Sequence, residues 1–345
     1  MQTEGILIHE TGGPEVLQWG SFELPEPGPR EVRVRVRAVA LNHLDLWTRR
    51  GLPNVKYEFP FRLGSDVAGE VDALGPGARG VTVGQKVMVN PGLTCGVCER
   101  CLDGDDNLCA KYRIMGENAQ GGYSRHINVP DTNLVPMPEG VSFTDAASIP
   151  LVSITAWQMV MRRAEVKLGQ TVLVQAAGSG VSSMAIQFCK LMGARVIATT
   201  GTDEKAARAR DLGADVVINY TTHDFLAECK RLTNKRGVDA VIEHVGGEVF
   251  TKSIVATARG GRVVTCGATS GYKPEVDLRQ IFFRQVQVLG STMGRKADLL
   301  RVVALLGDEK IRPVVDRVLP LREARQAHEA LEARQAFGKI VLSVE

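Results

Sequence analysis

The chain has 345 residues, more than one hydrophobic core usually holds, so two domains are expected. Hydrophobic residues make up 44% and charged residues 23%, and the net charge of +3 is dispersed, which gives no reason to expect nucleic-acid binding. The chain begins without a basic and apolar export segment, and no apolar run approaches the ~18 residues of a membrane span, so we expect a cytoplasmic protein without a membrane partner.

Short strands separated by glycine- and proline-rich turns are expected in the first 130 residues. Residues 32–37 alternate strictly between apolar and charged side chains, which is typical of a half-buried strand. A helical turn is expected between Asn42 and Gly51, and further strands within 60–71 and 84–89. Many short strands with this punctuation indicate a partly open, all-β barrel.

Four of the seven cysteines fall within fifteen residues, and they give the strongest local signal in the sequence. They are Cys95, Cys98, Cys101 and Cys109. Four thiols can converge on one tetrahedral zinc ion, and a site with four thiolate ligands has no open position, so it is structural. Metal–thiolate bonds would supply folding energy to a loop that has no apolar run of its own. The alternative is two local disulfides or free thiols, which is the weaker expectation in a chain without an export signal.

A strand, a turn of small residues and a helix follow one another between residues 171 and 192. Such a turn lets the backbone approach a pyrophosphate, and the N-terminus of the helix offers free N–H groups. The match to G-x-G-x-x-G is imperfect, because Ala177, Ser179 and Ser182 hold the glycine positions, with Gly178 and Gly180 between them. An ordinary strand–turn–helix without a ligand is the alternative.

Strands and helices continue to alternate after this turn. This spacing predicts a doubly wound parallel sheet, and six strands are the number that a full dinucleotide-binding fold needs. A helical stretch over 145–163 precedes the sheet, and the residues after 295 are expected to return to the barrel domain. The six predicted strands are 171–176, 195–199, 215–219, 239–243, 261–266 and 287–290.

These features together resemble the medium-chain dehydrogenase/reductases over nearly the whole chain. Within that family the sequence looks like the quinone oxidoreductase and enoyl-reductase branch rather than the zinc alcohol dehydrogenases. The motifs that carry the resemblance are Asn42-x-x-Asp45, Arg50 with Gly51, Asp66-x-Ala-Gly69, the four-cysteine lobe, Thr155-Ala-Trp157, Val181 after the small-residue turn, and Gly338-Lys-Ile-Val-Leu342.

The resemblance implies an α/β protein with two domains. One is a GroES-like, partly open β-barrel catalytic domain formed by 1–150 and 294–345, with a structural zinc lobe at 92–112. The other is a six-stranded, doubly wound parallel Rossmann domain formed by 151–293, which binds the nicotinamide cofactor.

The sequence departs from the zinc alcohol dehydrogenases at the positions of their catalytic zinc. Asn42 stands where they have cysteine, Gly64-Ser65-Asp66 stands where they have Gly-His-Glu, and residues 150–152 are apolar. Zinc needs three protein ligands and a water, so no catalytic metal is expected. By resemblance, Asn42 faces the nicotinamide and the substrate, Asp45 orients the loop, and Ser65 and Asp66 line the pocket. Alternatively, these residues only cap turns or lead into a strand.

The end of the second Rossmann strand bears on the choice of cofactor. NAD-preferring sheets place an acid there, which holds the ribose hydroxyls and repels a 2′-phosphate. Here Thr200 and Gly201 end the strand and Lys205 follows, a set that favours the phosphate of NADPH. The expected cofactor-binding residues are Thr155, Gly178, Ser179, Gly180, Val181, Thr200, Gly201, Lys205, Tyr220, Gly267 and Lys339.

The leading hypothesis is therefore an NADPH-dependent reductase of quinones or α,β-unsaturated carbonyls with one structural zinc. Without a Lewis acid, a ketone or alcohol is hard to polarise, whereas an electron-poor C=C bond needs only hydrogen-bond donors for its enolate. The first alternative is a zinc alcohol dehydrogenase that recruits Asp66 and His43. The second is a protein that binds NADPH without turnover. The substrate is expected to be a small molecule, and the resemblance implies a homodimer or homotetramer paired through 285–289.

Overall fold

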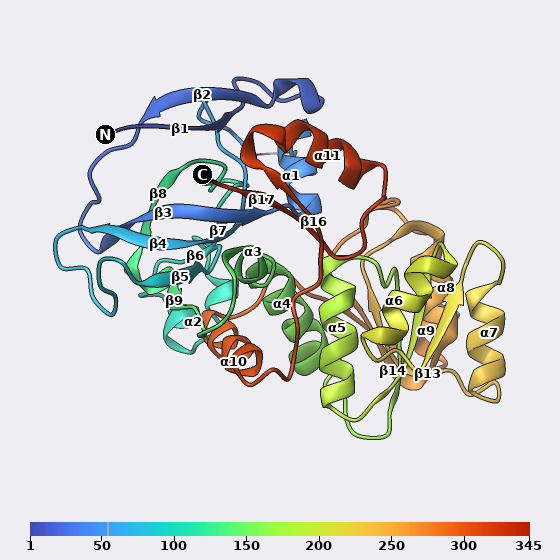
Figure 1. Cartoon of the computed structure of the whole chain (residues 1–345). Coiled ribbons are helices and arrows are strands. Elements are labelled where there is room, and N and C mark those ends of the chain that lie inside the picture. The colour runs from blue at the N-terminus through green and yellow to red at the C-terminus, as the bar shows by residue number, and fades with distance from the viewer. Residues whose placement is uncertain (54) are drawn as a thin grey trace. The chain divides into compact units, whose positions relative to one another are not determined.

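The computed structural model describes residues 1–53 and 55–345, and these form two compact units. Unit 1 contains Met1–Leu151 and Arg295–Glu345, and unit 2 contains Val152–Gly294. In Figure 1, unit 1 therefore combines the blue and green first part of the chain with its red end. None of the described helices is long and apolar enough to cross a membrane.

The main sheet of unit 1 has seven strands in the order β16-β17-β3-β4-β5-β9, with β8 also paired to β3. The alternation predicted for 32–37 is confirmed, because Val32, Val34 and Val36 are buried beneath more exposed neighbours. Burial becomes continuous at Ala38–Ala40, where β17 pairs with β3. The strands are β3 (Glu31–Ala40), β4 (Asp66–Leu74), β5 (Lys86–Val89), β8 (His126–Pro130), β9 (Leu134–Pro136), β16 (Val315–Pro320) and β17 (Lys339–Ser343).

Smaller elements complete unit 1 around the sheet. The hairpin of β1 (Gln2–Leu7) and β2 (Gln18–Glu23) forms a separate two-stranded sheet, and β6 (Gly92–Leu93) pairs with β7 (Arg113–Ile114). Helix α11 packs its alanine-rich face into the same core as β3 and β17. The helices are α1 (His43–Arg50), α2 (Glu99–Leu102), α3 (Phe143–Ala147), α10 (Lys296–Gly307) and α11 (Ala324–Glu332), with 3₁₀ turns at Pro14–Val16, Asp106–Leu108, Asp131–Asn133 and Leu321–Glu323.

Two details differ from the expected elements. The sequence favours a strand over 121–126, but residues 121–125 do not form one, because the N–H groups of Gly121 and Gly122 bond to the carbonyls of Arg62 and Gly64 in an irregular close approach. The helical stretch expected over 145–163 is divided into α3, α4 (Pro150–Trp157) and a π-helical segment, Gln158–Arg163. Proline 150 explains the first break, because a helix usually ends before the residue that precedes a proline.

Unit 2 is a six-stranded parallel sheet in the order β12-β11-β10-β13-β14-β15, as predicted. Strand β10 is buried along its whole length, as expected for a central strand covered on both faces. The order reverses between β10 and β13, and ligands of such sheets bind at that switch point. The strands are β10 (Thr171–Val174), β11 (Arg195–Thr200), β12 (Val216–Asn219), β13 (Val238–Glu243), β14 (Thr257–Thr265) and β15 (Gln287–Gly290), and the helices are α5 (Gly180–Leu191), α6 (Asp203–Asp211), α7 (Phe225–Leu232), α8 (Gly247–Ala256) and α9 (Arg279–Phe282).

Candidate functional site

A buried polar cluster in unit 1 joins Asn42, Asp66 and Lys339. Asn42 precedes α1, Asp66 begins β4, and Lys339 begins β17. The Lys339 ammonium donates to Asn42 Oδ1 at 2.5 Å and to Asp66 Oδ2 at 2.9 Å, and Asn42 Nδ2 donates to the same carboxylate oxygen at 2.9 Å. All three side chains are buried. The fold brings together two predicted catalytic residues, Asn42 and Asp66, and Lys339, which was expected to bind the cofactor.

Asp45 fixes the backbone next to this cluster through two hydrogen bonds. Its carboxylate accepts the N–H of Asn42 at 2.7 Å and the N–H of Gly64 at 2.8 Å. Burial raises the pKa of Asp45 to about 7, although the two N–H groups act in the opposite direction. Gly64 has φ +96°, and a Cβ there would lie 2.4 Å from the Tyr123 ring, so only glycine fits. Asp45 therefore ties the start of α1 to the loop before β4.

The donor set at this cluster does not fit a zinc ion. Ser65 Oγ donates to the Met115 carbonyl at 2.7 Å, and the second carboxylate oxygen of Asp66 accepts the N–H of Leu151 at 2.6 Å. Both Asp66 oxygens therefore have partners within the chain. Burial and the charge of Lys339 lower the pKa of His43 to about 4, but His43 belongs to no cluster of metal-binding side chains among the described residues. A zinc site needs three protein ligands, and within the described cluster of Asn42, Asp66 and Lys339 only Asp66 is an ordinary ligand.

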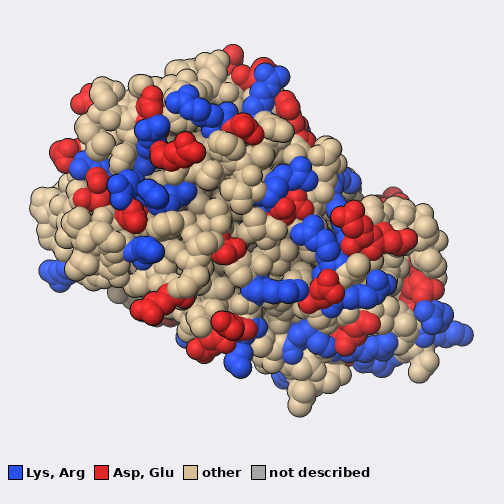
Figure 2. Space-filling model, in the orientation of Figure 1, with Lys and Arg blue, Asp and Glu red and all other residues tan. Residues whose placement is uncertain are grey.

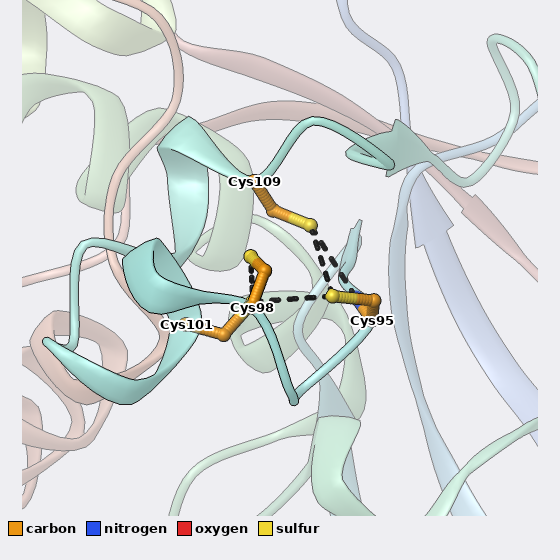
Figure 3. A group of neighbouring side chains, drawn as sticks. All are labelled: Cys95, Cys98, Cys101 and Cys109. Atoms are coloured by element: carbon orange, nitrogen blue, oxygen red, sulfur yellow. Dashed lines mark hydrogen bonds between the residues drawn. The ribbon is translucent and has the colours of Figure 1, made fainter.

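The four clustered thiols do fit a metal ion. Figure 3 shows Cys95, Cys98, Cys101 and Cys109 pointing toward one another from one lobe, and their sulfur atoms lie within 4.8 Å of each other. Three of the sulfur–sulfur distances are 3.5, 3.6 and 3.9 Å, with no disulfide. A tetrahedron with Zn–S bonds of about 2.3 Å has edges of about 3.8 Å. The spacing therefore suits one structural zinc.

The local backbone of this lobe also suits thiolate ligands. Backbone N–H groups of Val97 and Cys98 lower the pKa of Cys95 to about 6, and the N–H of Lys111 donates to Cys109 Sγ at 3.4 Å. Three apolar side chains in and beside the lobe remain largely exposed, so it has no core of its own: Val97, Leu102 and Leu108. The bound metal would therefore supply much of the lobe's folding energy.

The small-residue turn of unit 2 is held by an imidazole. Ser179 Oγ accepts the N–H of Ser182 at 3.0 Å and caps α5. Ser182 Oγ donates to the Gln175 carbonyl at 2.6 Å, so it must accept from His244 Nε2, 2.9 Å away. His244 Nε2 therefore carries a proton, and it also lies 3.0 Å from Ser179 Oγ. The serines at two of the expected glycine positions are held in place from β13, and the first turn of α5 stays open toward a phosphate.

Small and hydroxyl-bearing residues lie between the end of β11 and the start of α6. The strand ends at Thr200, and Thr202 caps α6 by accepting the N–H of Lys205 at 3.2 Å. A Cβ at Gly201 would lie 2.8 Å from the Tyr220 hydroxyl, so Tyr220 and the glycine adjoin. The first acid after the strand is Asp203, whose carboxylate accepts from Asn219 Nδ2 at 2.9 Å. No carboxylate ends β11 itself.

Two other expected cofactor residues have distinct environments. The hydroxyl of Thr155 is buried and has no hydrogen-bond partner among the described residues, as expected of a group reserved for a ligand. Gly267 follows β14, and its carbonyl accepts the Thr265 hydroxyl at 3.0 Å. The N-terminus of α5 and the Thr155 hydroxyl are compatible with a bound nicotinamide dinucleotide, although other buried polar atoms, such as Thr48 Oγ1 and Ser291 Oγ, also have no partner among the described residues.

The sequence did not indicate a second buried network in unit 1. Arg49 donates to His328 Nδ1 at 3.1 Å and forms a short ion pair with Glu332, and His328 Nε2 lies 3.0 Å from the Tyr123 hydroxyl. Because Arg49 can only donate, His328 carries its proton on Nε2 and donates to Tyr123. This network joins α1 to α11. No local pattern marks it, since its members are separated by up to 283 residues.

Comparison with known proteins identifies two matching family models. Residues 28–139 match the alcohol dehydrogenase GroES-like domain, and residues 180–308 match the zinc-binding dehydrogenase domain. The two matches fall on the β-rich part that contains the thiol lobe and on the parallel sheet with the helix that follows it.

Individual relatives cover the chain from end to end. The NAD-dependent alcohol dehydrogenase of Sulfolobus acidocaldarius is 30% identical over 99% of both chains. The quinone oxidoreductase of Pseudomonas aeruginosa is 32% identical over 96% of each. Among solved structures, an NAD-dependent alcohol dehydrogenase is 49% identical, covers 99% of this chain and 100% of its own, and superposes with a TM-score of 0.96.

Proposed function

The chain belongs to the zinc-type alcohol dehydrogenase superfamily of medium-chain dehydrogenase/reductases, and from that premise we propose a specific reaction. We propose that this oxidoreductase uses NADPH to reduce a quinone or an α,β-unsaturated carbonyl compound without a catalytic metal. The cluster of Lys339, Asp66 and Asn42 carries the proposal, because an ammonium ion engages Asp66, the carboxylate that stands at the predicted zinc-ligand position.

Lys339 can take over part of the electrostatic task of a metal. Its ammonium has three N–H donors, and within the described residues only Asn42 and Asp66 accept from it. One N–H is left to donate to a substrate oxygen. Asp66 and Asn42 hold the ammonium in place, so little reorganisation is needed when negative charge develops on that oxygen.

The proposed reaction follows from these donors. When bound, a reduced nicotinamide supplies a hydride for the electron-poor carbon of the acceptor. As the C=C bond accepts the hydride, charge moves to the carbonyl oxygen, where the Lys339 N–H stabilises the enolate. The enolate then takes a proton from water at carbon. An alcohol dehydrogenase must instead stabilise an alkoxide, a task for which related enzymes use a Lewis acid.

The preference for NADPH is supported by the end of β11. Thr200 and Gly201 leave room and hydroxyl groups where an acid would repel a 2′-phosphate, and Lys205 lies in the first turn of α6. Tyr220 adjoins Gly201 and stays half exposed, so its ring and hydroxyl are accessible to an adenosine moiety.

A second candidate is an NAD-dependent alcohol dehydrogenase. Two relatives that are NAD-dependent alcohol dehydrogenases favour it, including the solved structure that is 49% identical. It would require zinc to displace Lys339 from Asp66 and to find further ligands, with His43 as the nearest histidine in the sequence. The two candidates therefore differ in metal content as well as in substrate.

We also propose that the chain forms a homodimer through β15. This strand lies at the edge of the sheet, and its Val288 is exposed. Two exposed aromatic side chains, Phe282 and Phe283, lie just before it in sequence. An exposed edge with apolar side chains is a ready surface for pairing with a second copy. Sedimentation of the full chain tests this, with Val288→Lys expected to shift it toward monomer.

The deciding experiment measures zinc and activity on the same preparation. Protein purified without added metal should contain one zinc per chain and should oxidise NADPH with 2-cyclohexenone or a benzoquinone, and brief chelation should leave the rate unchanged. Cys98→Ser should remove the zinc. A second zinc that survives in Cys98→Ser, with alcohol oxidation abolished by chelation, would establish the alcohol dehydrogenase. Binding of NADPH without turnover of any acceptor would indicate a non-catalytic protein.

A further inference from the structure

A cavity in unit 2 gathers basic side chains away from the nucleotide-binding turn. Its volume is about 560 Å³, within the range of small-molecule sites. We propose that it binds a small anion that carries two or more phosphate groups. Besides Gln280, its polar lining consists of Lys230, Lys235, Arg236, Arg259 and Arg284.

The cavity lies at the amino ends of the strands, whereas the cofactor turn lies at their carboxyl ends. Its lining residues flank the starts of β13 and β14 and the end of α7, whereas the cofactor turn follows the carboxyl end of β10. All strands are parallel, and one six-residue strand such as β13 spans about 20 Å. Figure 2 shows Lys and Arg side chains at the lower right, over the region where Figure 1 labels α7, β13 and β14. The cavity is therefore not part of the nucleotide site.

Most of the basic side chains that line the cavity are not neutralised by an acidic side chain among the described residues. Arg236 is neutralised by a bidentate ion pair with Asp239, at 2.7 and 2.9 Å. The other four of the five cations have no ion pair to an acid in the described residues. The C-termini of α7 and α8 end nearby, and each contributes about half a negative charge, or about one in total. Four cations against one such charge leave a strongly positive cavity.

Two arginines are held ready for an anion. Arg284 donates to the carbonyls of Ile254 and Val255 at 3.3 Å, and also to Gln280 and to the Thr257 carbonyl, so its guanidinium is firmly positioned and keeps only part of its donor capacity. Arg259 donates to the Phe283 carbonyl at 3.0 Å. Burial and the charge of Arg259 lower the pKa of Arg284. An anion bound between the two guanidinium groups would relieve this repulsion, and their positions are already fixed before binding.

The two lysines supply mobile donors. Neither Lys230 nor Lys235 has a side-chain hydrogen bond or ion pair among the residues that the structure describes, and both are exposed. Their backbones are joined, since the Lys235 N–H donates to the Lys230 carbonyl at 2.7 Å. Lys235 has φ +64°, an uncommon conformation for a residue other than glycine, asparagine or aspartate. Asn234 before it also has a positive φ, and the two residues turn the chain after the end of α7, which places Lys235 at the cavity.

The chemistry of the lining selects phosphate. Guanidinium groups match the oxygen geometry of phosphate, and lysine adds a point charge to it. Several cations around one open depression favour a compact di- or triphosphate over a single carboxylate. A polymer such as a nucleic acid would need a basic stripe extending beyond the cavity.

Isothermal titration calorimetry with tripolyphosphate tests the proposal on the full-length protein. Saturating NADPH is present so that the nucleotide-binding turn after β10 is already occupied. One tripolyphosphate should bind per chain. The double variant Lys230→Gln/Lys235→Gln should weaken binding about a hundredfold, or about tenfold for each charged hydrogen bond lost. The matched control Lys167→Gln/Lys310→Gln removes the same charge from two exposed lysines outside the cavity and should bind as the wild type does.

Several outcomes would overturn the inference. Equal affinity in both double variants, or binding that fails to saturate at one ion per chain, would show only general attraction between charges. Binding of heparin without binding of tripolyphosphate would indicate a polymer surface instead. If the double variant is unstable, Lys235→Asn gives the same test with a residue suited to this backbone, and it should weaken binding about tenfold.

Discussion

The ammonium of Lys339 lies 2.9 Å from the carboxylate of Asp66, and both side chains are buried. Such a pair is costly to desolvate and often adds little stability over apolar residues. Asn42 bonds to both partners and leaves one ammonium N–H without an acceptor in the described residues. Stability alone therefore does not account for the pair, and under the proposed function its role is that of a positioned hydrogen-bond donor.

Removing Lys339 alone should destabilise the protein. Lys339→Met leaves the buried Asp66 carboxylate unpaired, and we expect the free energy of unfolding to fall by about 3–5 kcal/mol in urea titration. The double variant Lys339→Met/Asp66→Asn removes both charges and should recover most of that loss.

The same double variant separates stability from chemistry. If Lys339 donates to the substrate oxygen, kcat for enone reduction should remain about 10²–10³-fold below the wild type even though the fold is restored. Recovery of both stability and kcat would mean that Lys339 has only a structural role.

Loss of zinc should act on the thiol lobe and leave cofactor binding intact. Cys98→Ser removes one of the four ligands, so we expect zinc content to fall to nearly zero and Tm to decrease. The Kd for NADPH, measured by fluorescence, should stay within about twofold of the wild-type value, because the expected cofactor residues other than Lys339 belong to unit 2. Full zinc content in Cys98→Ser would contradict the four-thiol assignment. Cys229→Ser, at a buried cysteine outside the lobe, is the control.

The sequence predicted the parts of this protein that depend on local patterns. The six strands of unit 2 were predicted because each is a short apolar run followed by a helix. The four thiols were predicted because all lie within fifteen residues. The partner of Lys339 could not be predicted. Lys339 reaches Asn42 only because β17 pairs with β3, across 297 residues of sequence, and neither strand's pattern specifies the other.

His328 is a second residue whose partners could not be predicted from the sequence. In the sequence it is one of six scattered histidines, on a helix whose polar residues give no sign of a partner. Only the packing of α11 in the core of unit 1 buries it against Arg49 and Tyr123. The imperfect glycine motif has a similar explanation, because Ser182 is tolerated where His244 and the Gln175 carbonyl bind its hydroxyl.

Reversal of charge at Lys205 should change the choice of cofactor. Lys205→Glu places an acid close to the end of β11, and we expect KM for NADPH to rise about tenfold or more while KM for NADH changes little. Steady-state kinetics with both cofactors measures the ratio. Lys167→Glu makes the same charge change at an exposed position of unit 2 and should affect neither. An equal rise for both cofactors would remove the support for NADPH.

Protonation of His328 should destabilise the protein in mild acid. Burial, together with the charge of Arg49, lowers the pKa of His328 to about 3, against about 6.5 when unfolded. The unfolded chain thus binds one more proton between these values, so the stability from the neutral imidazole is present above pH 6.5 and is lost as the pH falls toward 3. The expected loss is about 1.4 kcal/mol per pH unit.

His328→Gln isolates this effect, because the glutamine amide can accept from Arg49 and donate to Tyr123 but does not titrate. Other groups still titrate in both proteins: the pKa of His43 is lowered to about 4, and that of Asp45 is raised to about 7 and has the opposite effect on stability. Only the difference between the two proteins therefore reports on His328. Urea titrations from pH 4 to 7 should show a shallower pH dependence for the variant, by about 1.4 kcal/mol per pH unit below pH 6. Parallel curves would show that His328 is already charged in the folded protein.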